Sequence, residues 1–555
     1  MNHNTTVTLS LALLACAVLF GLACAGAPAV ASVPPAATPV TTDVDLPSAS
    51  TGTPGGTLAL RIFAPASAGD TRYPEGAPVV VYVPGGTDAG TLRPALQQAD
   101  DVIRIVFLFP GGSDPRVGRS SDGAYDYRGA DSIAALRDVI RYAAGELTDD
   151  AGHTIDDVVP VPVLHDNIGL LGGSNGGNII VAVAGEHGSE LAGHLRYIIQ
   201  WESPVSSQIA TVDLGRVNLD CAPGHRQSLP AVNPRYLSYG PLTLDVDYSQ
   251  LAYDAGDPLH PVFFDGTGDG HYTTALDPHT GCRTPDLNLN GALELTEDFP
   301  LSTFTDGVKE FYSRPVTQAL ADQNIFGGSW PADIGTPPQA NAFWDLREAV
   351  QQYPAALANI PDLQGMALTS LVDHVQTASD HPHIHQAFDG WDGNGAWVKI
   401  NPARDYVVEA DPSLSSRTDL PDNAANTAPA DWTDAGSYAF PDSLEETYFA
   451  AAVHEMADRA HAASAPTPTP TATPTVTATP TSTPTIMAPT KSGTVSLNAL
   501  HGWSAQMDNH LKIFDVAVDE TRNRVYVMGI MTAGIAVIDG ETDTLIGSVD
   551  SGRSE

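Results

Sequence analysis

Basic residues are scarce in this sequence. Its 555 residues include 26 lysines and arginines against 66 aspartates and glutamates, which gives a formal net charge of −40. A protein this acidic repels phosphate backbones and anionic lipid headgroups, so nucleic acid is not expected as a partner. The sequence also lacks a G-x-G-x-x-G run and a Gly-Lys-Ser/Thr ending, so a phosphate-binding loop is not expected.

Long hydrophobic runs are scarce as well. One such stretch, residues 8–32, lies at the N-terminus, and its apolar core is too short and too early for a reliable membrane span. Its end contains the A-x-A cleavage pattern Ala29-Val30-Ala31. We therefore predict a signal peptide over residues 1–31 and a secreted or cell-surface protein, with no stable membrane insertion after cleavage. Lipidation of Cys24 is the less favoured alternative, because Gly21 stands where a lipoprotein box usually has an aliphatic residue.

Cysteine is rare too, with four residues in the chain. Signal cleavage would remove Cys16 and Cys24 and leave Cys221 and Cys282. In an oxidising compartment such a pair is most simply a disulfide, here closing a loop of about sixty residues and worth about 4 kcal/mol in the chain-entropy model. Two buried free thiols are the alternative.

The sequence does contain a glycine-dense G-x-S-x-G pattern. In the stretch "NIGLLGGSNGGNIIVAVAG", residues 167–185, Ser174 stands between Gly172 and Gly176. The residues before it suit a short buried strand, and those after it can begin a helix whose first amides face an oxyanion. A strained turn from strand to helix exposes a nucleophilic serine in this way. A glycine-rich turn without chemistry is the alternative.

Strands and helices alternate around this pattern. Buried strands are predicted within residues 77–86, 103–112 and 194–205, and residues 128–147 have helical spacing of apolar side chains. This alternation predicts an α/β fold with a parallel sheet that is covered on both faces.

The run "GGSNGG" resembles the nucleophile elbow of prolyl-oligopeptidase-type members of the α/β-hydrolase superfamily. The resemblance covers roughly residues 75–410, without the large propeller that precedes the catalytic domain in prolyl oligopeptidases. It implies an α/β-hydrolase parallel sheet and a serine nucleophile acting on a small ester or peptide. The oxyanion hole would then combine the amide of Asn175 with one from the loop near Gly86 or Thr87.

Two aspartates are candidates for the acid of a catalytic triad. Asp373 follows the apolar run in residues 365–372, which resembles the acid-bearing loop after the seventh strand of α/β-hydrolases. This assignment makes residues 206–364 a large cap insertion between strands six and seven. Asp269 is the alternate acid, although the spacing of its loop also suits a metal ligand.

The histidine base is harder to place. In the family order it should follow the eighth strand, predicted at residues 396–401, but the histidines between that strand and the Pro-Thr repeats, His454 and His461, lie on a helix-like segment. A cluster just after Asp373 contains the predicted base, His381, with His374 and His383 as alternates. Ligation of a transition metal by His383 and His385, or ordinary packing, stays open for this cluster.

A calcium loop is predicted in the proposed cap. The residues Asp286, Asn288, Asn290, Gly291 and Glu297 follow the spacing D-x-N-x-N-G-x5-E. This spacing presents oxygens at positions 1, 3 and 5 and a bidentate carboxylate at position 12, so we predict a structural Ca²⁺ ion as cofactor. An unliganded turn is the alternative.

Half of the calcium pattern also occurs earlier in the chain. Asp265, Thr267 and Asp269 occupy positions 1, 3 and 5, but Leu276 stands where the acid of position 12 should be. These residues form a second half-site in our prediction, with Asp269 as a ligand rather than a triad acid.

The C-terminal part differs in composition. Residues 464–489 are Pro-Thr repeats that cannot bury a core, so we predict a linker. Residues 490–555 alternate short strands with turns, and "RVYV" resembles a YVTN-type β-propeller blade. Because a propeller needs at least about four blades, this all-β fragment is expected to belong to a longer natural protein.

Two functions are consistent with these features. The leading expectation is a secreted serine hydrolase, an esterase or peptidase. The alternative is a catalytically silent, calcium-stabilised α/β-hydrolase-like module that binds a partner or attaches to a cell surface. The predicted segments are a signal peptide (1–31), an N-terminal extension (32–74), a hydrolase domain (75–463) with a cap (about 206–364), a linker (464–489) and a partial propeller (490–555).

Overall fold

The computed structural model describes residues 38–209, 213–221, 227–240 and 242–464, together with four strands near the C-terminus. The chain divides into two compact units, Met1–Thr467 and Pro468–Glu555. The predicted signal peptide and almost all of the predicted linker lie outside the described residues. No helix within the described ranges is long and apolar enough to cross a lipid bilayer.

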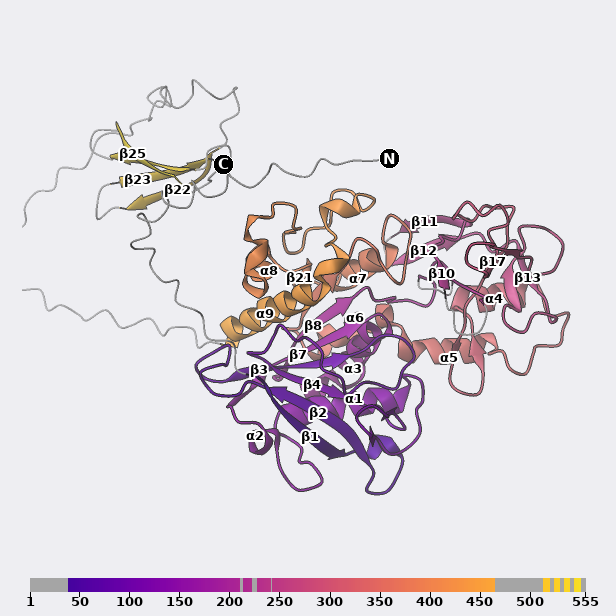
Figure 1. The fold of residues 1–555 in the computed structure, drawn as a ribbon, viewed down its shortest axis with the longest axis horizontal. Coiled ribbons are helices and arrows are strands. Elements are labelled where there is room, and N and C mark those ends of the chain that lie inside the picture. The colour runs from indigo at the N-terminus through magenta and orange to yellow at the C-terminus, as the bar shows by residue number, and fades with distance from the viewer. Residues whose placement is uncertain are drawn as a thin grey trace, which may run out of the picture. The chain divides into compact units, whose positions relative to one another are not determined.

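An eight-stranded mixed sheet forms the centre of the first unit (Figure 1). Its order is β1-β2-β4-β3-β7-β8-β20-β21. The strands β1 and β2 are antiparallel to their neighbours, whereas the strands from β4 to β21 run parallel to one another. The strands are β1 (Val40–Pro47), β2 (Thr57–Ala64), β3 (Ala77–Val83), β4 (Ile103–Phe107), β7 (Val163–Gly173), β8 (Leu195–Trp201), β20 (Gln364–Leu368) and β21 (Val398–Ile400).

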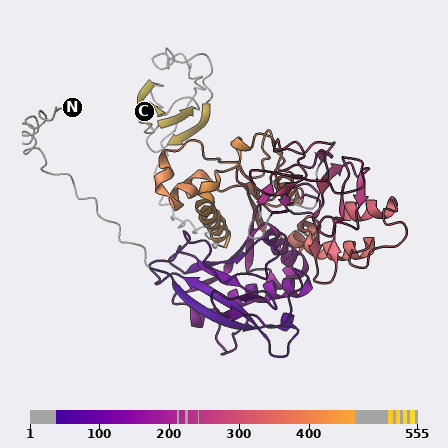
Figure 2. The same cartoon turned by 45° about the vertical axis from the view of Figure 1, so that its right-hand side comes forward.

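Helices cover both faces of this sheet (Figures 1 and 2). Successive side chains of a strand point to opposite faces, so Val79 and Val81 of β3 belong to one core while Val80 belongs to another. The first core includes residues of α1 (Ala130–Ala143), α3 (Asn175–Leu191), α6 (Tyr353–Asn359) and α7 (Pro382–Asp392). The second includes residues of α8 (Arg404–Ala410) and α9 (Glu445–Ser464). Burial on both faces explains the continuous apolar runs of the parallel strands.

The strands predicted within residues 77–86, 103–112 and 194–205 and the helix predicted within residues 128–147 are confirmed, each somewhat shorter than its sequence pattern. The strand before Ser174, β7, is longer than the short strand expected there. The sheet also begins earlier than the sequence analysis indicated. Its first two strands lie within residues 32–74, the segment predicted as an N-terminal extension. The first half of β1 is largely exposed at the edge of the sheet, so β1 has no continuous apolar run.

The segment between β8 and β20 builds a lobe with its own hydrophobic core, centred on Phe264, Phe299 and Tyr312. The predicted disulfide between Cys221 and Cys282 is present in this lobe. Its helices are α4 (Arg314–Asp322) and α5 (Pro337–Arg347), whereas α6 packs on α3 beside the central sheet. Its strands are β9 (Val217–Leu219), β10 (Gln227–Leu229), β11 (Tyr236–Gly240), β12 (Thr243–Val246), β13 (Leu251–Tyr253), β14 (Val262–Phe264), β15 (Ala275–Leu276), β16 (Arg283–Thr284), β17 (Phe299–Pro300), β18 (Phe304–Thr305) and β19 (Glu310–Phe311).

The short elements β5 (Ser113–Asp114), β6 (Arg119–Ser120) and α2 (Ile155–Val158) complete the first unit. In the second unit, four antiparallel strands pair in chain order: β22 (Ile513–Asp519), β23 (Arg524–Gly529), β24 (Gly534–Asp539) and β25 (Thr544–Asp550). A propeller blade has the same meander. The assignment of this four-stranded sheet to a propeller stays a prediction.

Candidate active site

Ser174 lies at the turn from β7 to α3, near the middle of the sheet. Its backbone has φ 47° and ψ −125°, a conformation that a residue with a side chain rarely adopts. The amide of Ser174 donates to the carbonyl of Trp201 at 2.8 Å, and its carbonyl accepts from the amide of Gly177 at 2.9 Å. Strained serines at strand-to-helix turns are typical of nucleophile elbows.

Close backbone contacts explain the glycines around Ser174. A Cβ atom on Gly172 would lie 2.5 Å from the carbonyl carbon of Gly176, and one on Gly176 would lie 2.3 Å from the carbonyl oxygen of Val83. Real Cβ atoms do not come this close to backbone atoms, so larger residues would force the elbow open. The G-x-S-x-G pattern is therefore a steric requirement of this turn.

The residues predicted for the oxyanion hole lie together. Asn175 is the first residue of α3, and its side-chain amide donates to the carbonyl of Gly86 at 3.4 Å. Gly86, Thr87 and Asn175 line one small pocket beside the elbow. Backbone amides at the start of a helix favour negative charge.

A histidine and a carboxylate lie just after the ends of two neighbouring strands of the sheet, β8 and β20. Glu202 follows β8, and His374 lies in the loop after β20. A hydrogen bond joins His374 Nδ1 to Glu202 Oε2, and the amide of His374 donates to the same oxygen at 3.2 Å. The His374 ring stacks on Trp201 with 4.8 Å between the ring centroids. Among the described residues, Nε2 of His374 has no hydrogen-bond partner.

The surroundings of Glu202 fix its carboxylate. Glu202 is fully buried, with φ 43°, and its Oε1 also accepts hydrogen bonds from the amide and hydroxyl of Ser370. Burial by itself would lower the pKa of His374, but the hydrogen bond and charge of Glu202 outweigh it, so that pKa is raised. The nearby charge of Asp373 acts in the same direction.

The expected pair of Asp373 and His381 is not formed. Asp373 Oδ2 instead bonds to Nε2 of His383 at 2.6 Å, and both side chains are buried. The other oxygen of Asp373 accepts from the amides of Val375 and Gln376. Nδ1 of His383 is buried, and no described residue hydrogen-bonds to it. An enclosed pair of this kind holds the loop after β20 in place.

His381 has a different environment. Its Nδ1 contacts the hydroxyl of Thr369 at 3.2 Å, and burial followed by the charge of His383 lowers its pKa. Of the two histidines considered as metal ligands, His383 is bound to Asp373, while His385 stacks on Trp432 with centroids 4.1 Å apart.

Burial and charge also shift the acid beside His383. Burial by itself would raise the pKa of Asp373, but the charge and hydrogen bond of His383 outweigh it, so that pKa is lowered. Glu202, Asp373 and His374 each offer one possible metal-ligand atom, and these three atoms lie within 4.8 Å of one another. No other such group of three or more side chains occurs in the described part of the chain.

The predicted calcium loop turns its carboxylates inward. Asp286 accepts hydrogen bonds from the amides of Asn290 and Gly291 at 3.2 and 2.7 Å. Glu297, at position 12, accepts from the amides of positions 2 and 9, Leu287 and Glu294, at 2.7 and 3.1 Å. Carboxylate oxygens are ligands of the kind that calcium prefers, and both acids are almost fully buried.

The half-site at Asp265 has the same arrangement with one substitution. Its position 12 is filled by Asp298, which follows the other loop and accepts from the amides of Thr267 and Thr273 at 3.1 and 2.7 Å. Asp265 accepts from Gly268 and Gly270 at 2.7 and 3.0 Å. Asp298 was missed from the sequence because it reaches the loop through tertiary packing.

Asp269 accepts hydrogen bonds within its own loop, from the amide of His271 and the hydroxyl of Thr273, at 2.9 and 3.0 Å.

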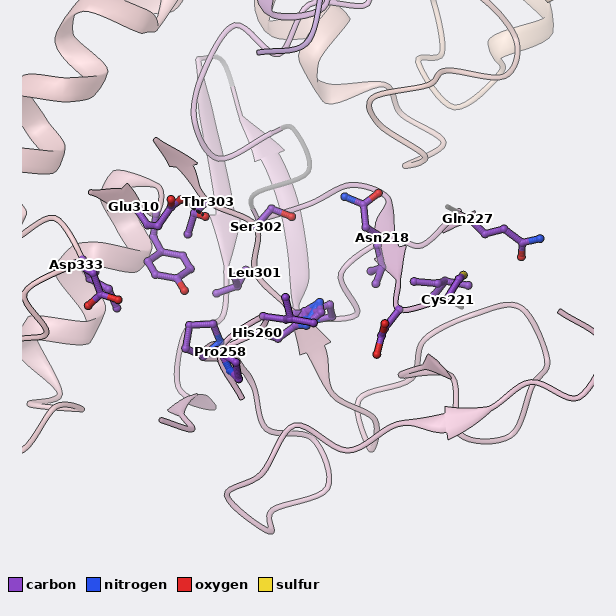
Figure 3. Close-up of a pocket in the computed structure, with 18 residues that line it drawn as sticks. Asn218, Cys221, Gln227, Pro258, His260, Leu301, Ser302, Thr303, Glu310 and Asp333 are labelled. Carbon is purple, nitrogen blue, oxygen red and sulfur yellow. Dashed lines mark hydrogen bonds between the residues drawn. The ribbon is translucent and has the colours of Figure 1, made fainter. Parts of the chain in front are cut away.

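A larger cavity, about 780 Å³, lies in the lobe between β8 and β20 and is lined by residues such as His260, Glu310 and Asp333 (Figure 3). None of the predicted catalytic residues lines it.

No protein-family model matches this chain, and no curated protein does. Among solved structures, a thermostable carboxylesterase cloned from a metagenomic library is 18% identical over 31% of this chain and 49% of its own, with a TM-score of 0.21. An esterase of Pyrobaculum calidifontis is 16% identical over 31% and 47%, with a TM-score of 0.21. A prolyl endopeptidase is 13% identical over 31% and 22%, with a TM-score of 0.22.

The match thus spans just under half the length of the two esterases. TM-scores this low carry no weight for the fold or the activity. The fold follows from the molecule itself, in the order of its strands and the turn at Ser174. This mixed, mostly parallel sheet fits the α/β-hydrolase fold.

Proposed function

We propose that this chain is a serine hydrolase that cleaves a small ester or peptide. Ser174 is its nucleophile, His374 its general base and Glu202 the acid that orients His374. This assignment replaces His381 and Asp373, the residues expected from the sequence.

The arrangement around Trp201 carries the proposal. The amide of Ser174 donates a hydrogen bond to the carbonyl of Trp201, and the imidazole of His374 stacks on the indole ring of Trp201. Glu202 engages Nδ1 of His374, which leaves Nε2 as the atom that can take a proton from a serine. His383, by contrast, is enclosed and committed to Asp373. Two carboxylates and a histidine also suit a metal ion, but the bond from Glu202 to Nδ1 is the one that a base requires.

The reaction follows from these roles. Ser174 Oγ attacks the carbonyl carbon as its proton moves to His374 Nε2, and the resulting oxyanion is held by the amide of Asn175 and one from Gly86 or Thr87. The bond to the leaving alcohol or amine then breaks, and that group takes the proton from His374. Water repeats the sequence on the acyl-enzyme and releases the acid and free Ser174.

Hydrolysis of a short-chain 4-nitrophenyl ester tests the proposal. The wild-type protein should release nitrophenolate with turnover, and Ser174→Ala should lose at least about 10³-fold in kcat. Equal rates for the two folded proteins would support the catalytically silent module instead.

We also propose that the loop 286–297 binds a structural Ca²⁺ ion, with Asp286, Asn288, Asn290 and Glu297 as protein ligands. The inward-facing carboxylates support this, because their charges would repel one another without a cation. The ion would stabilise the lobe and takes no part in the reaction. Asp265, Thr267 and Asp269 form the second half-site of this proposal.

Export of the protein is part of the same proposal. The disulfide between Cys221 and Cys282 supports an oxidising compartment. N-terminal sequencing of the protein recovered from culture medium should begin at Ser32.

A further inference from the structure

A small pocket lies beside the elbow, on the side of the oxyanion loop. Its volume of about 30 Å³ leaves room for about two water-sized groups. Asn175, Gly86 and Thr87 line one part of it. Aromatic side chains and two arginines make up most of the remaining lining, including Tyr125, Tyr127, Trp344, Arg128 and Arg347, together with Asn178, Ile179 and Thr305.

Arg128 is 6% exposed, and within the described ranges its guanidinium has no carboxylate partner. Its Nε donates to the hydroxyl of Tyr125 at 3.0 Å, and its Nη2 donates to the carbonyls of Pro84 and Asp88 at 2.9 and 3.1 Å. Its Nη1 is buried and has no hydrogen-bond partner among the described residues. A buried guanidinium with an unused donor is costly in a protein unless something else pairs with it.

Arg347 adds a second positive charge. Its three nitrogens donate to the backbone carbonyls of Tyr127, Phe343 and Asp126 at 2.8 to 2.9 Å. Burial lowers the pKa of Arg347 to about 10, so its side chain is still charged at neutral pH. The carboxylate of Asp126 is engaged by the amides of Gly129 and Asp131 at the start of α1.

The backbone that presents Arg128 is strained. Tyr127 and Arg128 both have positive φ, 54° and 68°, which is uncommon for one such residue and more so for two in sequence. The bonds from Arg347 to the carbonyls of Asp126 and Tyr127 hold this turn. Strain of this kind concentrates at ligand-binding sites.

We infer that this pocket binds a carboxylate carried by the substrate, with Arg128 Nη1 as donor and Arg347 as a second positive charge. The inference rests on the proposed serine hydrolase, because the pocket adjoins the residues that would hold the oxyanion. A carboxylate is small and negatively charged, which suits the size of the pocket, the unpartnered Nη1 of Arg128 and the charge of Arg347. The substrate class is therefore an ester or peptide with an acidic group near the scissile carbonyl.

Two matched esters test the inference. Mono-4-nitrophenyl glutarate carries a terminal carboxylate, and 4-nitrophenyl valerate is its neutral analogue. The wild type should prefer the glutarate ester by about 10- to 100-fold in kcat/KM, the range expected for one charge-assisted hydrogen bond. Arg128→Met should reduce the preference to about twofold or less. The control is Arg104→Met, which removes a buried arginine of β4 that pairs with Asp100. In this control the preference for the glutarate ester should persist.

A binding measurement covers variants that fold poorly and the case of no turnover. At matched ionic strength, glutaramate, which carries one carboxylate, should raise the melting temperature of the wild type more than valeramide, its neutral analogue, does. Equal shifts in melting temperature would overturn the carboxylate pocket. So would a wild type that hydrolyses both esters through Ser174 with the same kcat/KM, although the proposed serine hydrolase activity would then still hold. Hydrolysis of neither ester would count against the proposed function, and the melting shift would then decide the pocket alone.

Discussion

Glu202→Gln is the most informative single change in the proposed site. The glutamine keeps the shape of the side chain, but its amide nitrogen can lie opposite Nδ1 of His374. Nδ1 must then accept a hydrogen bond, so the imidazole proton moves to Nε2, the atom that should receive the proton of Ser174. A wrong tautomer of this kind lowers kcat by about 10⁴ in serine proteases, and we expect a loss of about 10³ to 10⁴ here.

Asp373→Asn is the matched control for this variant. Asp373 is also a buried carboxylate bonded to a histidine, but its partner is His383. Each variant weakens a hydrogen bond to a charged group, so each should lose about 1.5–3 kcal/mol of stability in urea unfolding. Steady-state hydrolysis of a 4-nitrophenyl ester, normalised to folded protein, should show less than about a tenfold loss for Asp373→Asn. The reverse order of the two losses would refute the assignment of Glu202 and restore Asp373 as the acid.

Three further outcomes follow from the structure. Because the pKa of His374 is raised and the base must be neutral, the acid limb of kcat/KM should have its midpoint above about 6.5, whereas a midpoint below it would favour a base of lowered pKa. Gly176→Ala should destabilise the protein by about 1–3 kcal/mol in urea, against the helix propensity of alanine, because its Cβ would meet the carbonyl of Val83. EGTA should lower the melting temperature of the wild type, and added calcium should restore it, because an ion at one hundred times its Kd adds about 2.7 kcal/mol to the free energy of unfolding. The effect of EGTA should be smaller in Asp286→Ala. A wild-type melting temperature that EGTA leaves unchanged would exclude the ion.

The strand-to-helix turn at Ser174 could be predicted from the sequence because its determinants are local. An apolar strand, glycines around Ser174 and a following helix occur within about twenty residues of chain. The edge strand β1 was missed for the opposite reason: it owes its place to pairing with β2, and its own residues alternate only weakly.

The partners of Ser174 could not be read in the same way. The segment ending in "QWESPV" looked like one continuous strand, so Glu202 seemed to lie inside it, whereas β8 ends at Trp201 and Glu202 turns away with positive φ. A carboxylate at the end of a parallel strand was the available signal. Four histidines follow within twelve residues of Asp373, and only tertiary packing decides which one stacks on Trp201.

The most direct test of the central claim is the site of reaction with a fluorophosphonate. Intact-mass and peptide mass spectrometry of the wild-type protein should find one adduct per chain, on Ser174, with none in Ser174→Ala and strongly slowed labelling in His374→Ala. A folded wild type that stays unlabelled, or an adduct on another residue, would contradict the account.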